Sequence, residues 1–106
     1  MISPTKAQIL KSYVRSINIF DSSMGIIISA DIKSKSRPGI SHYSRIIIDP
    51  MRNKIINSSC DCEAFAFRKS CWHLELLEYL AMNEYKNEIE KAREYRKRLA
   101  EEALNW

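Results

Sequence analysis

Hydrophobic residues follow two different spacings along this chain of 106 residues, one in each half. Between residues 14 and 59, apolar and polar positions alternate, as they do in strands that bury one face. Ile26, Ile28 and Ile32, for example, fall on one side of such a strand. After residue 73, apolar side chains recur three and four positions apart, which indicates an amphipathic helix. The pattern therefore predicts an α+β fold, with a sheet followed by a long C-terminal helix.

Turn residues divide the first half of the chain into short elements. Ser3 and Pro4 form a helix-start signal, because serine caps helices and proline is favoured at their first position. Clusters of Asp, Ser, Pro and Gly mark the later turns. We expect a short helix over about residues 4–12 and an antiparallel meander of about four strands, over residues 14–20, 24–33, 41–49 and 54–59.

The C-terminal part of the chain contains no proline or glycine from residue 72 to residue 106. A single helix over this stretch would be ~50 Å long, which is more than a domain of this size needs. We expect either a break near Asn83, after which the helix folds back, or a second half that reaches a partner. The candidate partner-binding residues are Tyr85, Ile89, Tyr95, Leu99 and Trp106.

The composition is that of one compact domain. No apolar run approaches the ~18 residues that would predict a membrane-spanning helix. Isoleucine, lysine and glutamate are abundant and glutamine is scarce, a mixture that leans toward a thermophilic origin. The sequence has no signal peptide and only three cysteines, so we expect an intracellular, reducing compartment, either the cytoplasm or the nucleoid or nucleus.

Positive charge is concentrated in the first half of the chain. Residues 1–59 carry nine Lys and Arg against three Asp, a net of +6, whereas residues 60–106 carry eight against ten acidic residues, a net of −2. A basic surface attracts phosphate backbones, although any soluble surface needs some charge. The candidate nucleic-acid-binding residues are Lys33, Lys35, Arg37, Arg45, Arg52 and Lys54.

All the cysteines lie in one short segment, residues 60–73, with the spacing Cys60-x-Cys62, eight residues, then Cys71-x-His73. Three thiols and one imidazole complete the tetrahedral shell of structural zinc sites and leave no position for a catalytic water. We therefore expect one structural Zn²⁺ ion, bound by Cys60, Cys62, Cys71 and His73. No pair of a nucleophile and a base is evident elsewhere, so we do not expect an enzyme.

Other interpretations of these residues are weaker. A disulfide between Cys60 and Cys62 would be strained, and buried free thiols with an incidental histidine would not need this spacing. His73-Leu74-Glu75 resembles the H-x-E of zinc deaminases, but in those enzymes the histidine precedes the cysteine pair. His42 lies on a predicted strand, and we expect it to be a surface or edge residue rather than a ligand.

The spacing also predicts how the chain delivers the four ligands. Cys60 and Cys62 point to one side if the strand is extended. Residues two apart in a helix do not share a face, so we expect Cys71 at a helix start and His73 in the first turn. Ser70 is the expected N-cap. The free ring N–H of His73 should reach an acceptor, which the sequence does not identify.

The metal segment with its surroundings resembles a SWIM-type zinc finger, and the chain is similar to the small prokaryotic or viral members of that family. The family is marked by C-x-C, a variable gap and C-x-H on a ββα unit. The four ligands Cys60, Cys62, Cys71 and His73 match one for one, and Phe65 matches the aromatic residue after the C-x-C.

The resemblance covers about residues 4–82, although only residues 60–77 are specific. Lys69 and Ser70 stand where members often have glycine or proline, and Trp72 where they often have a basic residue. We accordingly divide the chain into a SWIM-type zinc-binding domain, residues 1–82, and a helical extension, residues 83–106, which is part of the same unit or binds a partner.

The resemblance implies DNA binding or protein binding rather than catalysis by the finger. We expect a non-enzymatic zinc module that binds nucleic acid, with DNA favoured, mainly through phosphate contacts. The alternative is an interaction adaptor that uses its C-terminal helix to bind a protein or a second copy of itself. A small inhibitor encoded by a virus or mobile element is also compatible with the length.

Overall fold

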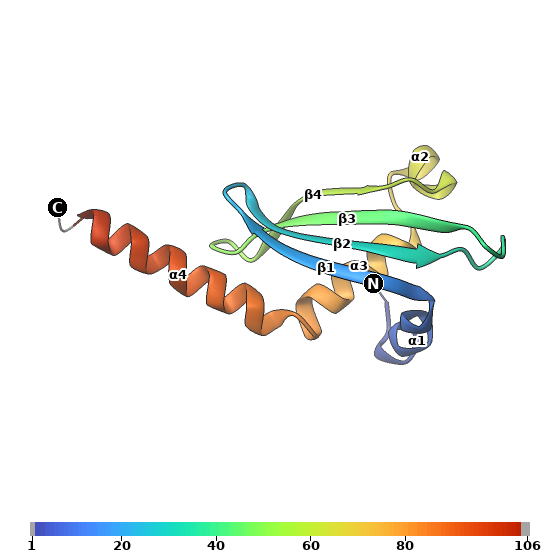
Figure 1. Cartoon of the computed structure of the whole chain (residues 1–106), viewed down its shortest axis with the longest axis horizontal. Helices are drawn as coiled ribbons and strands as arrows, with labels where there is room; N and C mark the ends of the chain where they lie inside the picture. Colours follow the sequence, from blue (N-terminus) through green and yellow to red (C-terminus); the bar gives the residue numbers. More distant parts are fainter. Residues whose placement is uncertain (1, 105–106) are drawn as a thin grey trace.

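The computed structural model describes residues 2–104, which form a four-stranded sheet with four helices (Figure 1). The elements in chain order are α1 (Pro4–Leu10), a 3-10 turn (Lys11–Tyr13), β1 (Val14–Ser22), β2 (Gly25–Lys33), β3 (Ser41–Asp49), β4 (Lys54–Cys60), α2 (Glu63–Arg68), α3 (Trp72–Asn83) and α4 (Lys86–Leu104). The α+β class is as predicted.

The sheet is an antiparallel meander in the order β1-β2-β3-β4, as the alternating pattern predicted. Each strand lies within two residues of its expected bounds. The inner face carries rows of apolar side chains, because residues that pair across strands share a face. One such row joins Ile28, Ile46 and their neighbours, and the next row along joins Ala30, Ser44 and Cys60. The sheet thereby places Cys60, the first of the four expected metal ligands, on the face that α3 covers.

Helix α3 packs against β2, β3 and β4 and closes the core. Leu76 and Leu77 are fully buried, together with Ile28, Ile32 and Ile46 of the sheet. Burial of each such side chain contributes about 1.5–3 kcal/mol, so the contact between α3 and the sheet contributes much of the stability of the core. It also fixes the N-terminus of α3, which carries two ligands, against the end of β4.

The C-terminal helical stretch breaks where it was expected, just after Asn83. The backbone N–H groups of Glu84 and Tyr85 both donate to the carbonyl oxygen of Leu80, at 2.8 and 3.0 Å, and α4 begins at Lys86. The helix does not fold back, which corrects that part of the expectation. The C-terminal end of α4 extends beyond the sheet, and the molecule is therefore elongated, with extents of 56 × 26 × 22 Å (Figure 1).

The first half of α4 is anchored to the sheet. Ile89 and Ala92 are buried, and Arg96 Nη2 donates to Asp21 Oδ1 at 2.6 Å and to the carbonyl oxygen of Ser22 at 2.9 Å. Arg93 Nε donates to the carbonyl oxygen of Pro50 at 2.7 Å. The later turns of α4 have no such contacts among the described residues and are exposed to solvent.

Candidate metal centre

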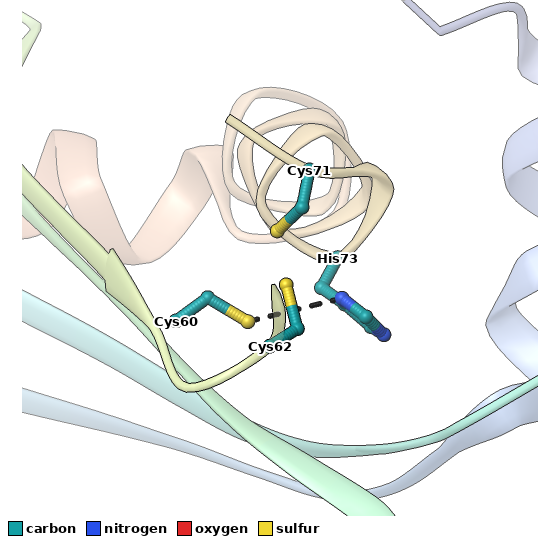
Figure 2. A group of neighbouring side chains, drawn as sticks. All are labelled: Cys60, Cys62, Cys71 and His73. Atoms are coloured by element: carbon teal, nitrogen blue, oxygen red, sulfur yellow. Dashed lines mark hydrogen bonds between the residues drawn. The ribbon is translucent and has the colours of Figure 1, made fainter. Parts of the chain in front are cut away.

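Three elements, β4, α2 and α3, bring the four ligand side chains together at one end of the sheet (Figure 2). Cys60 is the last residue of β4, and Cys62 is the N-cap of α2. Cys71 is the N-cap of α3 and His73 lies in the first turn of that helix. The predicted placement of Cys71 and His73 is therefore confirmed. The prediction of Ser70 as N-cap is wrong, because the extended residue that precedes the helix is Cys71.

The ligand atoms of Cys60, Cys62, Cys71 and His73 lie within 4.8 Å of one another, and all four residues are buried. Cys60 Sγ and His73 Nδ1 are 3.8 Å apart (Figure 2). A tetrahedral zinc site with bonds of ~2.0–2.3 Å separates its ligand atoms by roughly 3.5–3.8 Å. The four side chains thus fit one metal ion after adjustments of up to about 1 Å.

Hydrogen bonds from the protein favour the thiolate forms at this site. The fully buried Ser44 hydroxyl donates to Cys60 Sγ at 3.2 Å, and the N–H of Phe65 donates to Cys62 Sγ at 3.4 Å. The pKa of Cys60 lies well below its ordinary range, chiefly because the Cys71 thiol donates to it and further because of His73 and Ser44. Sharing that hydrogen bond raises the pKa of Cys71. A bound metal cation would take the place of the proton that Cys60 and Cys71 share.

The donor set favours a structural ion over a catalytic one. Three sulfurs and one nitrogen fill a tetrahedral shell, and soft thiolate ligands favour zinc among the common divalent ions. The three cysteines are free, so no disulfide competes for the sulfurs. A Cys60–Cys62 disulfide, the strained alternative, is thus not formed.

One nitrogen of the His73 imidazole faces the thiols, and the other faces away from them. Its Nδ1 faces Cys60 Sγ, and its Nε2 lies on the far side of the ring (Figure 2). Nε2 is buried and has no hydrogen-bond partner among the described residues. If Nδ1 binds the metal, Nε2 carries the ring proton. The expected acceptor for that proton is therefore not supplied by the protein atoms of residues 2–104.

Sequence reasoning missed the role of His42 at this centre. His42 ends the inner row that contains Ile32, and its ring lies 5.1 Å from that of His73. Its Nδ1 is 3.0 Å from Asp61 Oδ1, and the side chain is only 21% exposed. His42 is thus a half-buried neighbour of the metal ligands, although it is not one of them. The register of β2 and β3 would have placed it on the covered face.

A second feature missed by sequence reasoning is helix α2, which fills the gap between the ligand pair Cys60 and Cys62 and the ligand pair Cys71 and His73. It is capped by Cys62, whose sulfur accepts the N–H of Phe65. Lys69 ends it in the left-handed conformation, with φ of 59°. Helix α2 and the left-handed residue that ends it reverse the chain and return Cys71 to the metal centre. Lys69 thus adopts a conformation that glycine reaches more easily, at a modest conformational cost.

The six candidate nucleic-acid-binding residues do not form one cluster. Lys33, Lys35 and Arg37 lie at the metal end of the sheet, where β2 ends and the following loop begins. Arg52 and Lys54 belong to the β3–β4 turn at the opposite end. A strand of nine residues separates the two groups, which corresponds to roughly 26 Å. Arg45 lies between them on the outer face, half-buried, with its Nε unpartnered among the described atoms.

Several of these cations already have contacts. Arg37 Nη2 is 3.2 Å from Glu63 Oε1, and Arg52 Nε is 3.6 Å from Asp49 Oδ2. Lys35 Nζ lies 4.9 Å from the centre of the Trp72 ring, in a cation–π contact. The loop between β2 and β3 is thereby held against the N-terminus of α3, next to the metal ligands.

The five candidate partner-binding residues divide between the core and the surface. Ile89 is buried, and Tyr85 packs against the hydrophobic core. Tyr95 and Leu99, on α4, are 53% and 47% exposed. Trp106 lies outside the described residues.

A scan against protein-family models finds no match for this chain, and comparisons with curated proteins and with solved structures find none either. Among the helices described, none has both the length and the apolar character needed to cross a membrane. The function must therefore be argued from the residues themselves.

Proposed function

We propose that this chain is a non-enzymatic, SWIM-type zinc-finger module that binds nucleic acid, with DNA favoured, mainly through phosphate contacts. The observation that carries the proposal is the position of the β2–β3 loop, whose cations lie beside a buried Cys₃His cluster. A zinc ion bound there would tie β4, α2 and α3 together and hold the loop in place.

The charge distribution supports a phosphate-binding surface. Of the three aspartates in the first half, Asp21 pairs with Arg96 and Asp49 pairs with Arg52, whereas Asp31 has only the Ser16 hydroxyl as a partner among the described residues. Within residues 2–104, Lys33, Lys35 and Lys54 make no ion pair. Free cations on a rigid scaffold can each neutralise a phosphate and release a counterion. Such contacts orient a protein on a duplex but carry little sequence information.

A salt-dependent titration tests this proposal. Affinity for a duplex oligonucleotide should fall steeply as salt rises, and replacing Lys33 and Lys35 together by alanine should weaken binding and reduce the salt slope by about two. Replacing Lys86 and Lys91 on α4 together by alanine is the matched control, since it removes two exposed cations away from the loop. Absence of binding at low salt would refute the proposal, as would an equal loss in the control.

A second function is favoured by the projecting helix. Tyr95 and Leu99 lie four positions apart on one face of α4, and they are 53% and 47% exposed. Exposed apolar side chains at this spacing are typical of a helix that pairs with another chain. The adaptor hypothesis predicts that Tyr95→Ser combined with Leu99→Ser abolishes self-association or partner capture. Ile89 and Ala92 stay intact in that variant, so the fold is preserved, and unchanged sedimentation would argue against the hypothesis.

A further inference from the structure

A cavity of about 200 Å³ opens beside the metal ligands, between the β2–β3 loop and the starts of α2 and α3. Its outer wall is the basic loop, residues 34–37, and its inner wall includes the rings of His42, Trp72 and His73. The cavity is therefore built from the same segments that the ion would hold together, and it reaches the surface along the loop.

The ring of His73, which is part of the inner wall, has a buried nitrogen without a hydrogen-bond partner among the described residues. His73 is 5% exposed, its ring lies 4.1 Å from that of Trp72, and its Nε2 faces away from the thiols (Figure 2). With Nδ1 on the metal, this Nε2 must carry a proton. A buried N–H without an acceptor carries a desolvation penalty, which a hydrogen-bond acceptor seated in the cavity would remove.

The outer wall adds groups that are donors as well. Lys35 and Arg37 are permanent cations there, and the hydroxyl groups of Ser34 and Ser36 lie 3.4 Å apart on the same loop. The N–H of Arg37 donates to Ser34 Oγ at 3.1 Å, which fixes the turn. A ligand that satisfies this set must offer several acceptor oxygens at once. A phosphate group does so, and Arg and Lys are its usual protein partners.

The charges around the cavity must allow an anion. Glu63 also lines it and partly neutralises Arg37, at 3.2 Å. A zinc ion with three thiolates would carry one net negative charge. The positive end of the α3 dipole offsets the negative charges of Glu63 and of the zinc–thiolate group. Lys35, whose only partner within residues 2–104 is the Trp72 ring, offsets them as well. The balance is close to neutral, which suits an anion that is held by directed hydrogen bonds and released readily.

We infer that this cavity binds one phosphate group, free or in a nucleic-acid backbone, with the Nε2–H of metal-bound His73 as its innermost donor. The inference rests on the zinc centre of the proposed function but not on its nucleic-acid partner. His73 would then have two roles, as a metal ligand through one nitrogen and as the sensor of the phosphate through the other. Lys35 and Arg37 would close the site from the loop.

The test is a titration of the zinc-loaded full chain with inorganic phosphate, followed by NMR of the His73 ring. The Nε2–H and the carbon-bound Cε1–H signals should shift in a saturable way. Lys35→Ala should weaken phosphate binding about tenfold, the value expected for a lost charge-assisted contact. Lys91→Ala, on α4, should change it less than twofold.

The outcomes separate the site from its source of phosphate. If a duplex oligonucleotide shifts the same ring signals, the phosphate belongs to a backbone. If only inorganic phosphate does so, the cavity takes the free anion, and the nucleic-acid proposal must stand on its own titration. Unmoved His73 signals with both probes would overturn the inference, even if the oligonucleotide binds elsewhere. Equal weakening by Lys35→Ala and Lys91→Ala would also overturn it, because it would indicate unspecific charge attraction.

Discussion

The two ends of the sheet are stabilised in different ways. At the metal end, β4, α2 and the start of α3 meet around three thiols and an imidazole, with Ser44 behind Cys60. At the other end, the β1–β2 turn and the start of α4 are joined by buried apolar side chains and by Arg96. The comparison teaches that the first region gathers four potential ligands for one metal ion, whereas the second uses ordinary packing and hydrogen bonds.

The largest effect should come from removing the ion. Chelation, or Cys71→Ser, should unfold the metal end and lower the free energy of unfolding by at least about 3–5 kcal/mol, because metal binding and folding share one free energy. Acid should act in the same direction, since the thiols must lose their protons to bind. Circular dichroism with and without a chelator measures the change, and restoring zinc should reverse it. A chelated protein that melts unchanged would contradict the comparison.

A core substitution should weaken the whole fold instead of one end. Leu77 is fully buried between α3 and the sheet, so Leu77→Ala should cost about 2–5 kcal/mol through lost transfer energy and a cavity. Denaturant unfolding in excess zinc measures it, and metal stoichiometry should stay at one ion per folded chain. Loss of the ion from the folded variant would mean that the two regions are coupled more tightly than we describe.

The hydrogen bond behind Cys60 offers a finer test of the metal end. Ser44→Ala removes the hydroxyl that donates to Cys60 Sγ at 3.2 Å. Loss of such a supporting contact typically lowers metal affinity 10–100-fold, and we expect the lower value here because only one of four ligands is affected. Competition with a chromogenic chelator measures the affinity. Ser58→Ala, on the neighbouring row of the same sheet, is the control and should change the affinity less than twofold.

The smallest effect should follow from loosening α4. Arg96 holds the β1–β2 turn through Asp21 and the Ser22 carbonyl, so Arg96→Ala should destabilise the fold by about 1–2 kcal/mol. Arg98→Ala, an exposed cation on the same helix, should cost under about 0.5 kcal/mol. Thermal melts with zinc present compare the two variants. An equal effect would show that α4 is not anchored through Arg96.

The sheet could be read from the sequence because its signal is local. Alternation of isoleucine with polar residues and turn residues between the strands placed all four strands. The break after Asn83 was also foreseen, but the direction of α4 was not. That direction depends on the contact of Arg96 with Asp21, which lies 75 positions away in the sequence. No local pattern encodes such a contact.

The metal centre was partly readable for a different reason. Cysteines and a histidine at ligand spacing predict a site without knowledge of the fold, and the four side chains do come together. Ser44 and His42 could not be found in this way, because they reach the centre through the pairing of β3 with β4 and β2. The basic residues looked like one patch in sequence, yet the length of β3 separates them into two groups.

The most direct test of the account is the metal content of the purified, folded chain. Elemental analysis, combined with native mass spectrometry, should find one zinc ion per molecule, and mutation of Cys60, Cys62, Cys71 or His73 should abolish it. Folded protein that contains no stoichiometric metal, and that takes up none when zinc is added, would contradict the account.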